Sequence, residues 1–147
     1  MKKIICFVLC ITTLLCSLSF SAFAAEAEKD AIEPRYNNVA MTDSSFVILS
    51  NGSAEVTVAY YGSSGITTGA TITTQIQKKV LGLFWKKVDI GVADNTWVEN
   101  VSDHSFGTYY TVQLTDKGTY RAKIHYTIYG TAGPADEIDD LLTYKYQ

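Results

Sequence analysis

The feature that most constrains the fold is an apolar residue at every second position in several short stretches. The longest stripe consists of Tyr120, Ala122, Ile124, Tyr126 and Ile128. Successive side chains of a β-strand point to opposite faces, so this spacing predicts a strand with one buried face and one wet face. Similar alternation occurs at 54–61, 70–79 and 108–114, without a helical stripe of comparable length. The chain is therefore expected to be all-β.

Turn signals separate these stretches. Asn51-Gly52 is a two-residue hairpin signal, because both residues tolerate positive φ. Asp116-Lys117-Gly118 marks a second turn. Further strands are expected at 46–50, 84–90, 97–101 and 138–146. Seven or eight short strands with turns between them predict an antiparallel β-sandwich.

The N-terminus has the three-part layout of a secretory signal peptide. Lys2 and Lys3 precede a mostly apolar run, and Ala22-Phe23-Ala24 is a suitable cleavage site. The alternative is a membrane anchor, but the run is short for a span of ~20 residues. The expected organisation is a signal peptide at 1–24, a flexible leader at 25–35 and a single domain at 36–147.

Export and charge limit the partners of this domain. The three cysteines all lie in the predicted signal peptide, so the mature domain would contain neither a disulfide nor a thiolate metal site. Removing Lys2 and Lys3 leaves 10 basic and 15 acidic residues, a net charge of −5. A nucleic-acid-binding domain needs a basic face, so no nucleic-acid partner is expected. No cofactor is expected either, and the protein should be secreted, either free or held non-covalently at the cell wall.

The segment Leu114-Thr115-Asp116-Lys117-Gly118-Thr119-Tyr120 resembles the D-x-G-x-Y corner before the sixth strand of immunoglobulin domains. The resemblance implies a structural corner in which Asp116 and Gly118 form the turn and the Tyr120 hydroxyl bonds back to nearby backbone. It also places Ala122 at the position of the second family cysteine. Because that cysteine and a tryptophan on the third strand are both missing, the implied fold is an immunoglobulin-like sandwich rather than an antibody-type domain.

More of the chain is similar to small secreted β-sandwich proteins of Gram-positive bacteria. The similar pieces are Gln77-Lys78-Lys79, Trp85-Lys86-Lys87-Val88 and Lys117-Gly118-Thr119-Tyr120-Arg121-Ala122-Lys123. This resemblance implies a fold, export and a bacterial source. It transfers no functional residue to this chain.

An apolar segment between two lysine pairs is the first candidate site. Its residues are Leu81, Leu83, Phe84 and Trp85, followed by Lys86 and Lys87. Hairpin tips are usually polar. An apolar tip with a basic collar is suited to an anionic membrane interface or to a protein partner. The structural alternative is that Leu81, Phe84 or Trp85 fold back onto the core.

Exposed aromatic rings are the second candidate. Tyr61, Tyr109 and Tyr129 are expected on outward strand faces and could provide a stacking platform for sugars. The alternative is ordinary cross-strand pairing.

Two polar groups are weaker candidates. Asp136, Glu137, Asp139 and Asp140 could collect Ca²⁺, but their spacing matches no calcium loop, so a solvated start of the last strand is expected. His104 and His125 are the two histidines, and the sequence has neither a G-x-S-x-G elbow nor an H-x-x-x-H pair. No catalytic residue and no metal ligand is therefore assigned.

Taken together, the sequence predicts a secreted, non-catalytic binding domain. Its partner would be a cell-surface protein, a cell-wall polymer or a glycan. One alternative is a membrane-active or toxin-like factor that acts through the apolar hairpin Val80–Trp85. Another is a structural subunit that associates through its edge strands.

Overall fold

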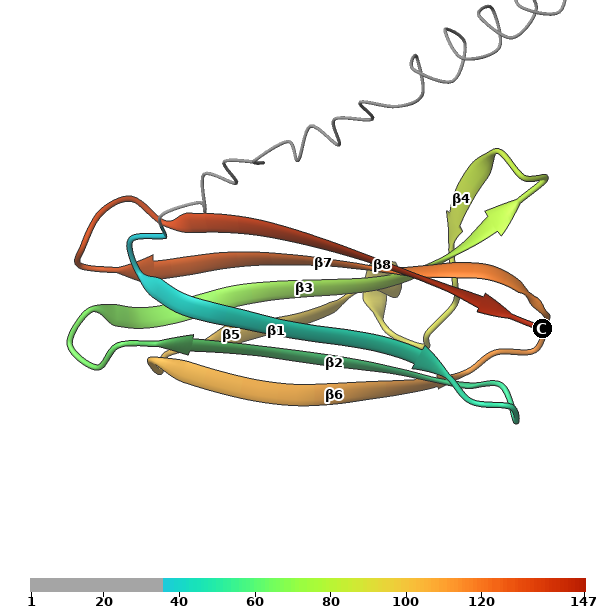
Figure 1. Cartoon of the computed structure of the whole chain (residues 1–147), viewed down its shortest axis with the longest axis horizontal. Helices are drawn as coiled ribbons and strands as arrows, with labels where there is room; N and C mark the ends of the chain where they lie inside the picture. The colour runs from blue at the N-terminus through green and yellow to red at the C-terminus, as the bar shows by residue number, and fades with distance from the viewer. Residues whose placement is uncertain (1–35) are drawn as a thin grey trace, which may run out of the picture. The chain divides into compact units, whose positions relative to one another are not determined.

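Eight β-strands account for most of the described chain, which comprises residues 36–147 of a computed structural model (Figure 1). The strands are β1 (Val39–Ile48), β2 (Ser53–Gly62), β3 (Thr67–Val80), β4 (Phe84–Lys87), β5 (Trp97–Val101), β6 (Ser105–Gln113), β7 (Gly118–Gly130) and β8 (Asp136–Tyr146). One short 3-10 turn, η1 (Ala93–Asn95), precedes β5. The expectation of an all-β chain with seven or eight strands is confirmed. The predicted signal peptide and leader lie outside the described residues.

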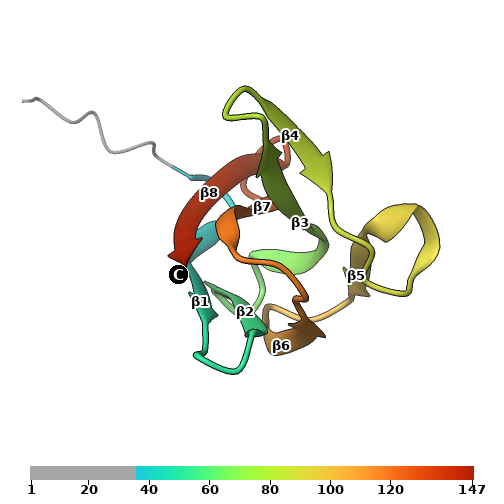
Figure 2. The ribbon, with the colours of Figure 1, turned by 90° about the vertical axis from the view of Figure 1, so that its right-hand side faces the viewer.

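The strands form two antiparallel sheets that enclose a common core (Figure 2). One sheet has the order β1-β2-β6, and the other has the order β4-β3-β7-β8. β3 is 14 residues long, and one of its edges pairs with β7. Its opposite edge pairs with β5 along Ala70–Thr74 and with β4 along Gln77–Val80. β3 is therefore the strand that connects the core to the two outlying strands.

The core consists of the inward faces predicted by the alternation. Fully buried side chains include Val56, Val58 and Tyr60 on β2, Ile72 and Ile76 on β3, and Ile124, Tyr126 and Ile128 on β7. Full burial of an aliphatic side chain contributes about 1.5–3 kcal/mol relative to exposure. These central strands therefore supply most of the apolar stabilisation.

β1 begins at Val39, well before the predicted strand at 46–50, so that predicted start was wrong. The early part of β1 lacks an apolar stripe because Ser44 lies at a partly buried position. Its Oγ donates to Asp140 Oδ2 at 2.6 Å and lies 2.7 Å from Tyr126 Oη. A polar network therefore replaces apolar contact where β1 meets β8. The predicted strand at 84–90 was also too long, since β4 ends at Lys87.

The turn before β7 has the geometry that the corner resemblance implies. Tyr120 is buried, and its hydroxyl donates to the carbonyl oxygen of Asp116 at 2.5 Å. Gly118 has a φ of 148°, a backbone conformation that favours glycine. Lys78 Nζ forms an ion pair with Asp116 Oδ2 at 2.9 Å. Ala122 is fully buried two residues beyond the corner tyrosine.

The buried Tyr126 should make the fold sensitive to alkali. Burial raises the pKa of Tyr126 to about 12, and burial also raises the pKa values of Tyr60 and Tyr110. Unfolded tyrosine ionises at about pH 10. Between that pH and about 12 the unfolded chain therefore releases protons that the folded chain retains. The contribution of these buried neutral tyrosines to folding stability is fully present below this range and is lost as the pH rises through it.

The expected result is that the urea midpoint falls steeply across this alkaline range, and that Tyr126→Phe flattens the fall. Urea titrations of both proteins at several alkaline pH values would measure it. Parallel pH profiles for the two proteins would show that Tyr126 does not carry the effect.

Candidate binding surface

The β3–β4 hairpin is the candidate surface, and it continues past the end of the neighbouring strand. The last pair between β3 and β7 is Lys78 with Tyr120, whereas β3 runs on to Val80. In the turn, Leu83 N–H donates to Val80 O at 3.1 Å. Leu81 and Gly82 have φ values of 52° and 70°. Positive φ is uncommon for a side chain as large as leucine.

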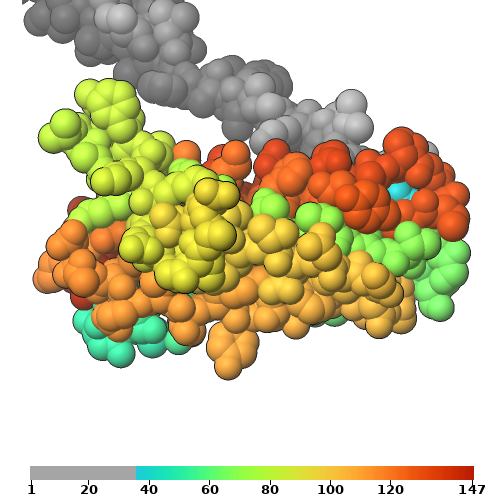
Figure 3. All heavy atoms as spheres, turned by 180° about the vertical axis from the view of Figure 1, so that it is seen from behind, coloured from blue at the N-terminus to red at the C-terminus, as the bar shows by residue number. Residues whose placement is uncertain are grey.

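The apolar side chains of this hairpin point into solvent. Leu81 is 84% exposed, Leu83 is 74% exposed and Phe84 is 65% exposed. Figures 1 and 3 show the hairpin projecting from the body of the sandwich. The alternative in which Leu81 or Phe84 folds back onto the core is therefore wrong. We call Val80, Leu81, Leu83 and Phe84 the apolar tip.

Trp85 lies at the base of the apolar tip and is half-buried, although it is not packed against the core. The Arg121 guanidinium lies over its ring, with Cζ 4.2 Å from the ring centroid. Lys79 Nζ lies 5.7 Å from the same centroid. Arg121 is held in turn by Gln77, because its Nε donates to Gln77 Oε1 at 2.8 Å. The indole is thus fixed by cation–π contacts rather than by apolar packing.

Cationic side chains surround the hairpin behind the tip. We call Lys78, Lys79, Lys86, Lys87 and Arg121 the basic collar. Lys78 stands directly opposite Lys86, while Lys79 and Lys87 belong to the other face, together with Arg121. Like charges directly opposite each other in a sheet are destabilising. The ion pair with Asp116 neutralises Lys78, and Lys86 is the second lysine on that face, so the collar presents cations on both faces.

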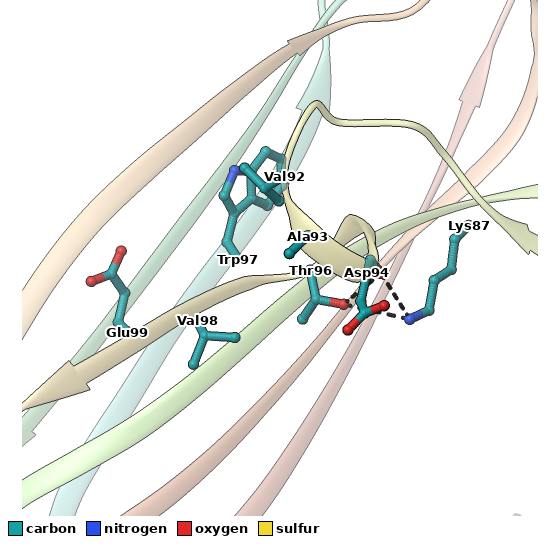
Figure 4. Close-up of a pocket in the computed structure, with 8 residues that line it drawn as sticks. All are labelled: Lys87, Val92, Ala93, Asp94, Thr96, Trp97, Val98 and Glu99. Carbon is teal, nitrogen blue, oxygen red and sulfur yellow. Dashed lines mark hydrogen bonds between the residues drawn. The ribbon is translucent and has the colours of Figure 1, made fainter.

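An open pocket of about 690 Å³ lies beside the collar, between β4, η1 and β5 (Figure 4). Lys87 Nζ donates to the backbone oxygen of Asp94 at 3.0 Å at its rim. Trp97 lines the pocket, but one face of its indole is stacked on Tyr110 at 4.5 Å. Tyr110 Oη donates to Glu99 Oε1 at 3.0 Å. The aromatic and polar groups are thus largely engaged with one another.

The three candidate tyrosines do not form one strip. Tyr61 on β2 and Tyr109 on β6 share the outer face of the β1-β2-β6 sheet. Tyr109 stands opposite Thr57, which is four residues from Tyr61 or about 13 Å along the strand. Tyr129 belongs to β7 in the other sheet, with its hydroxyl 3.4 Å from Thr71 Oγ1. A sugar could not stack on all three rings at once.

The acidic residues at the start of β8 point to alternate faces. Asp136 is only 5% exposed and accepts hydrogen bonds from the backbone that leads into β1. Glu137 and Asp139 lie on the outer face, beside His125. The expected solvated start of the last strand is therefore wrong for Asp136. Within residues 36–147, no group of three or more His, Cys, Asp or Glu residues is arranged to hold a metal ion.

The hydroxyl of Thr127 and the ring of His125 both contact one carboxylate. Thr127 Oγ1 donates to Glu137 Oε2 at 2.9 Å, and His125 Nε2 lies 2.8 Å from the same oxygen. His125 Nδ1 lies 3.1 Å from Asp139 Oδ1. β7 is a central strand, so its backbone N–H groups form the hydrogen bonds that join it to β3 and β8. They are therefore not free to stabilise a substrate oxyanion beside His125.

The other histidine, His104, has a neighbouring carboxylate as its partner. Its Nδ1 lies 2.8 Å from Asp103 Oδ1.

The collar member that sequence analysis missed is Arg121. It lies 44 residues from Gln77 in the chain and joins the hairpin through the pairing of β3 with β7. The sequence signal was the Tyr120–Ile128 alternation, which places Arg121 on the outer face. The partner strand was still needed to bring it to Trp85.

Comparison with known proteins gives no match, whether with family models, curated proteins or solved structures. Among the described residues, no helix is long and apolar enough to cross a membrane.

Proposed function

We propose that this chain is a secreted, non-catalytic binding domain whose contact surface is the apolar tip of the β3–β4 hairpin. The observation that carries the proposal is the exposure of Leu81, Leu83 and Phe84 on one projecting turn. Scattered apolar side chains are normal on protein surfaces, whereas a contiguous cluster marks an interaction site. The candidate partners are a surface protein, a cell-wall polymer, a glycan or a membrane.

The conformation of the turn supports this role. Leu81 occupies a left-handed conformation that Asn, Asp or Gly would adopt at lower cost. Its side chain gains no contact with the core in return. Unfavourable local geometry combined with unfavourable exposure is typical of a residue retained for contact with a partner.

The proposed fold is an immunoglobulin-like sandwich. The orders β1-β2-β6 and β3-β7-β8 correspond to strands A-B-E and C-F-G of that family. The Tyr120 corner at the start of β7 corresponds to the corner of strand F. One departure is that β5 pairs with β3, whereas strand D of constant-type domains belongs to the A-B-E sheet.

The proposal is tested by binding of the fluorescently labelled chain, without residues 1–24, to intact bacterial cells and to isolated cell walls. Leu83→Ser should weaken binding about tenfold, because it removes exposed apolar contact area without a core change. Leu141→Ser is the matched control, since Leu141 is 56% exposed on β8, away from the hairpin. Equal binding by both variants, or no binding by the unaltered chain, would overturn the proposal.

A further inference from the structure

We propose that the partner of the hairpin is an anionic lipid surface, into whose headgroup region the apolar tip inserts. This inference rests on the proposed role of the hairpin as the contact surface. It adds the chemistry of the partner and the orientation of the domain on it.

The shape of the tip suits a lipid interface. Val80 and Phe84 form a cross-strand pair on one face, and Leu81 and Leu83 occupy the turn beyond them. The apolar groups therefore surround a narrow convex end instead of forming a flat patch. A protein partner would need a pocket that encloses this end, whereas a lipid interface surrounds any convex apolar group.

The basic collar lies at a suitable distance from the tip. Lys79 precedes Leu81 by two residues, and Lys86 follows Phe84 by two, which corresponds to about 7 Å along a strand. Interfacial segments insert their apolar groups about 5–10 Å into the boundary between headgroups and acyl chains. With the tip at that depth, the ammonium groups on both faces would lie at the level of the lipid phosphates. Each would then strengthen binding to an anionic surface.

Trp85 lies at the level of the collar, directly opposite Lys79 and next to Phe84 of the tip. Tryptophan is enriched at the headgroup level of membranes because its ring is apolar and its N–H is polar. Here Arg121 and Lys79 both contact the ring, which favours its position beside the collar before the domain meets a membrane. The collar cations therefore also orient the aromatic ring.

The distribution of charge singles out the hairpin. Residues 36–147 contain eight basic residues, and five of them form the collar. The same residues contain 11 acidic side chains, so the domain carries 8 − 11 = −3 overall, whereas all five charged residues of the collar are basic. An anionic surface would repel most of the domain and attract this one end. The charge asymmetry thus favours an orientation with the apolar tip directed at the lipid.

The test uses the chain without residues 1–24, and vesicles of phosphatidylcholine alone or mixed in equal parts with phosphatidylglycerol. We expect co-sedimentation with the anionic vesicles, weakened by high salt, and little with the neutral ones. In a Trp97→Phe background, fluorescence of Trp85 should shift to the blue on binding. Lys79→Gln with Lys86→Gln should reduce binding about thirtyfold, and Leu83→Ser should reduce it about tenfold.

A matched charge change elsewhere provides the control. Lys123→Gln removes one positive charge from the middle of β7, opposite Gln75, and should leave vesicle binding nearly unchanged, whereas Lys79→Gln alone should reduce it about fivefold. Equal losses in Lys79→Gln and Lys123→Gln, or no vesicle binding, would overturn the lipid inference. If cells still bound the chain in a Leu83-dependent manner, the proposed function would survive with a protein or polymer partner. If cell binding were indifferent to Leu83, both proposals would fail.

Discussion

Replacing Asp136 by alanine is expected to lower the free energy of unfolding by about 4 kcal/mol. Its carboxylate accepts three backbone hydrogen bonds, from Asn37 at 2.9 Å, Asn38 at 2.7 Å and Val39 at 3.1 Å. Asn38 and Val39 are buried, so water would not readily replace the lost acceptor. Hydrogen bonds to a charged group contribute more than neutral ones, and buried donors left unpaired add their own cost.

Urea denaturation of Asp136→Ala and of Asp139→Ala would measure this difference. Asp139 is on the same strand, but its side chain is 63% exposed and contacts the surface residue His125. Its removal should cost at most about 1 kcal/mol. Hydrogen exchange at the amides of Asn38 and Val39 should be faster in Asp136→Ala than in the control. Similar stabilities for the two variants would show that the Asp136 carboxylate does not anchor β1.

The central strands could be predicted from the sequence because each has one face fully in the core. In β2, β3 and β7 the inward positions are apolar with few exceptions, and the period of two determines the face of every residue. β1 lacked this signal. Its inward Ser44 is satisfied by Tyr126 and Asp140, which lie more than 80 residues away in the chain.

Asp136 shows how the same alternation can be overlooked within a charged segment. It stands two residues before the buried Ile138, so the period of two places it on the inner face. Its acidic neighbours suggested a solvated segment instead. Only the position of the chain entering β1 supplies the three donors that make burial of this carboxylate favourable.

The apolar tip is exposed because β3 continues beyond the end of its pairing with β7. The local sequence of the hairpin does not contain this difference. An apolar hairpin end has the same pattern whether it covers the core or projects from it. The outcome depends on the pairing of β3 with β7, which ends at Lys78 and leaves the tip without a neighbour on that side. The lysine pairs were visible in the sequence, but their distribution over both faces follows from the register of β3 with β4.

Replacing Gly69 by alanine is expected to lower the free energy of unfolding by about 2–3 kcal/mol. An added Cβ would overlap the backbone oxygen of Val101 and lie 3.3 Å from Ser102 Cα. Because these are backbone atoms, relief requires a shift of β5 away from β3. That shift would break the pairing of Ala70 with Val101 at the end of β5. Glycine is needed at this position for close approach of two strands.

Gly107→Ala is the matched control for this prediction, because it adds the same methyl group to another strand. The added Cβ would lie 3.6 Å from Ala59 Cβ, an ordinary van der Waals contact. This variant should change stability by no more than about 0.5 kcal/mol, with a small gain from the reduced freedom of the unfolded chain. Urea midpoints of the two variants give the comparison. Equal midpoints would mean that β5 can move away from β3 at little cost, and that its pairing does not contribute to the cooperative core.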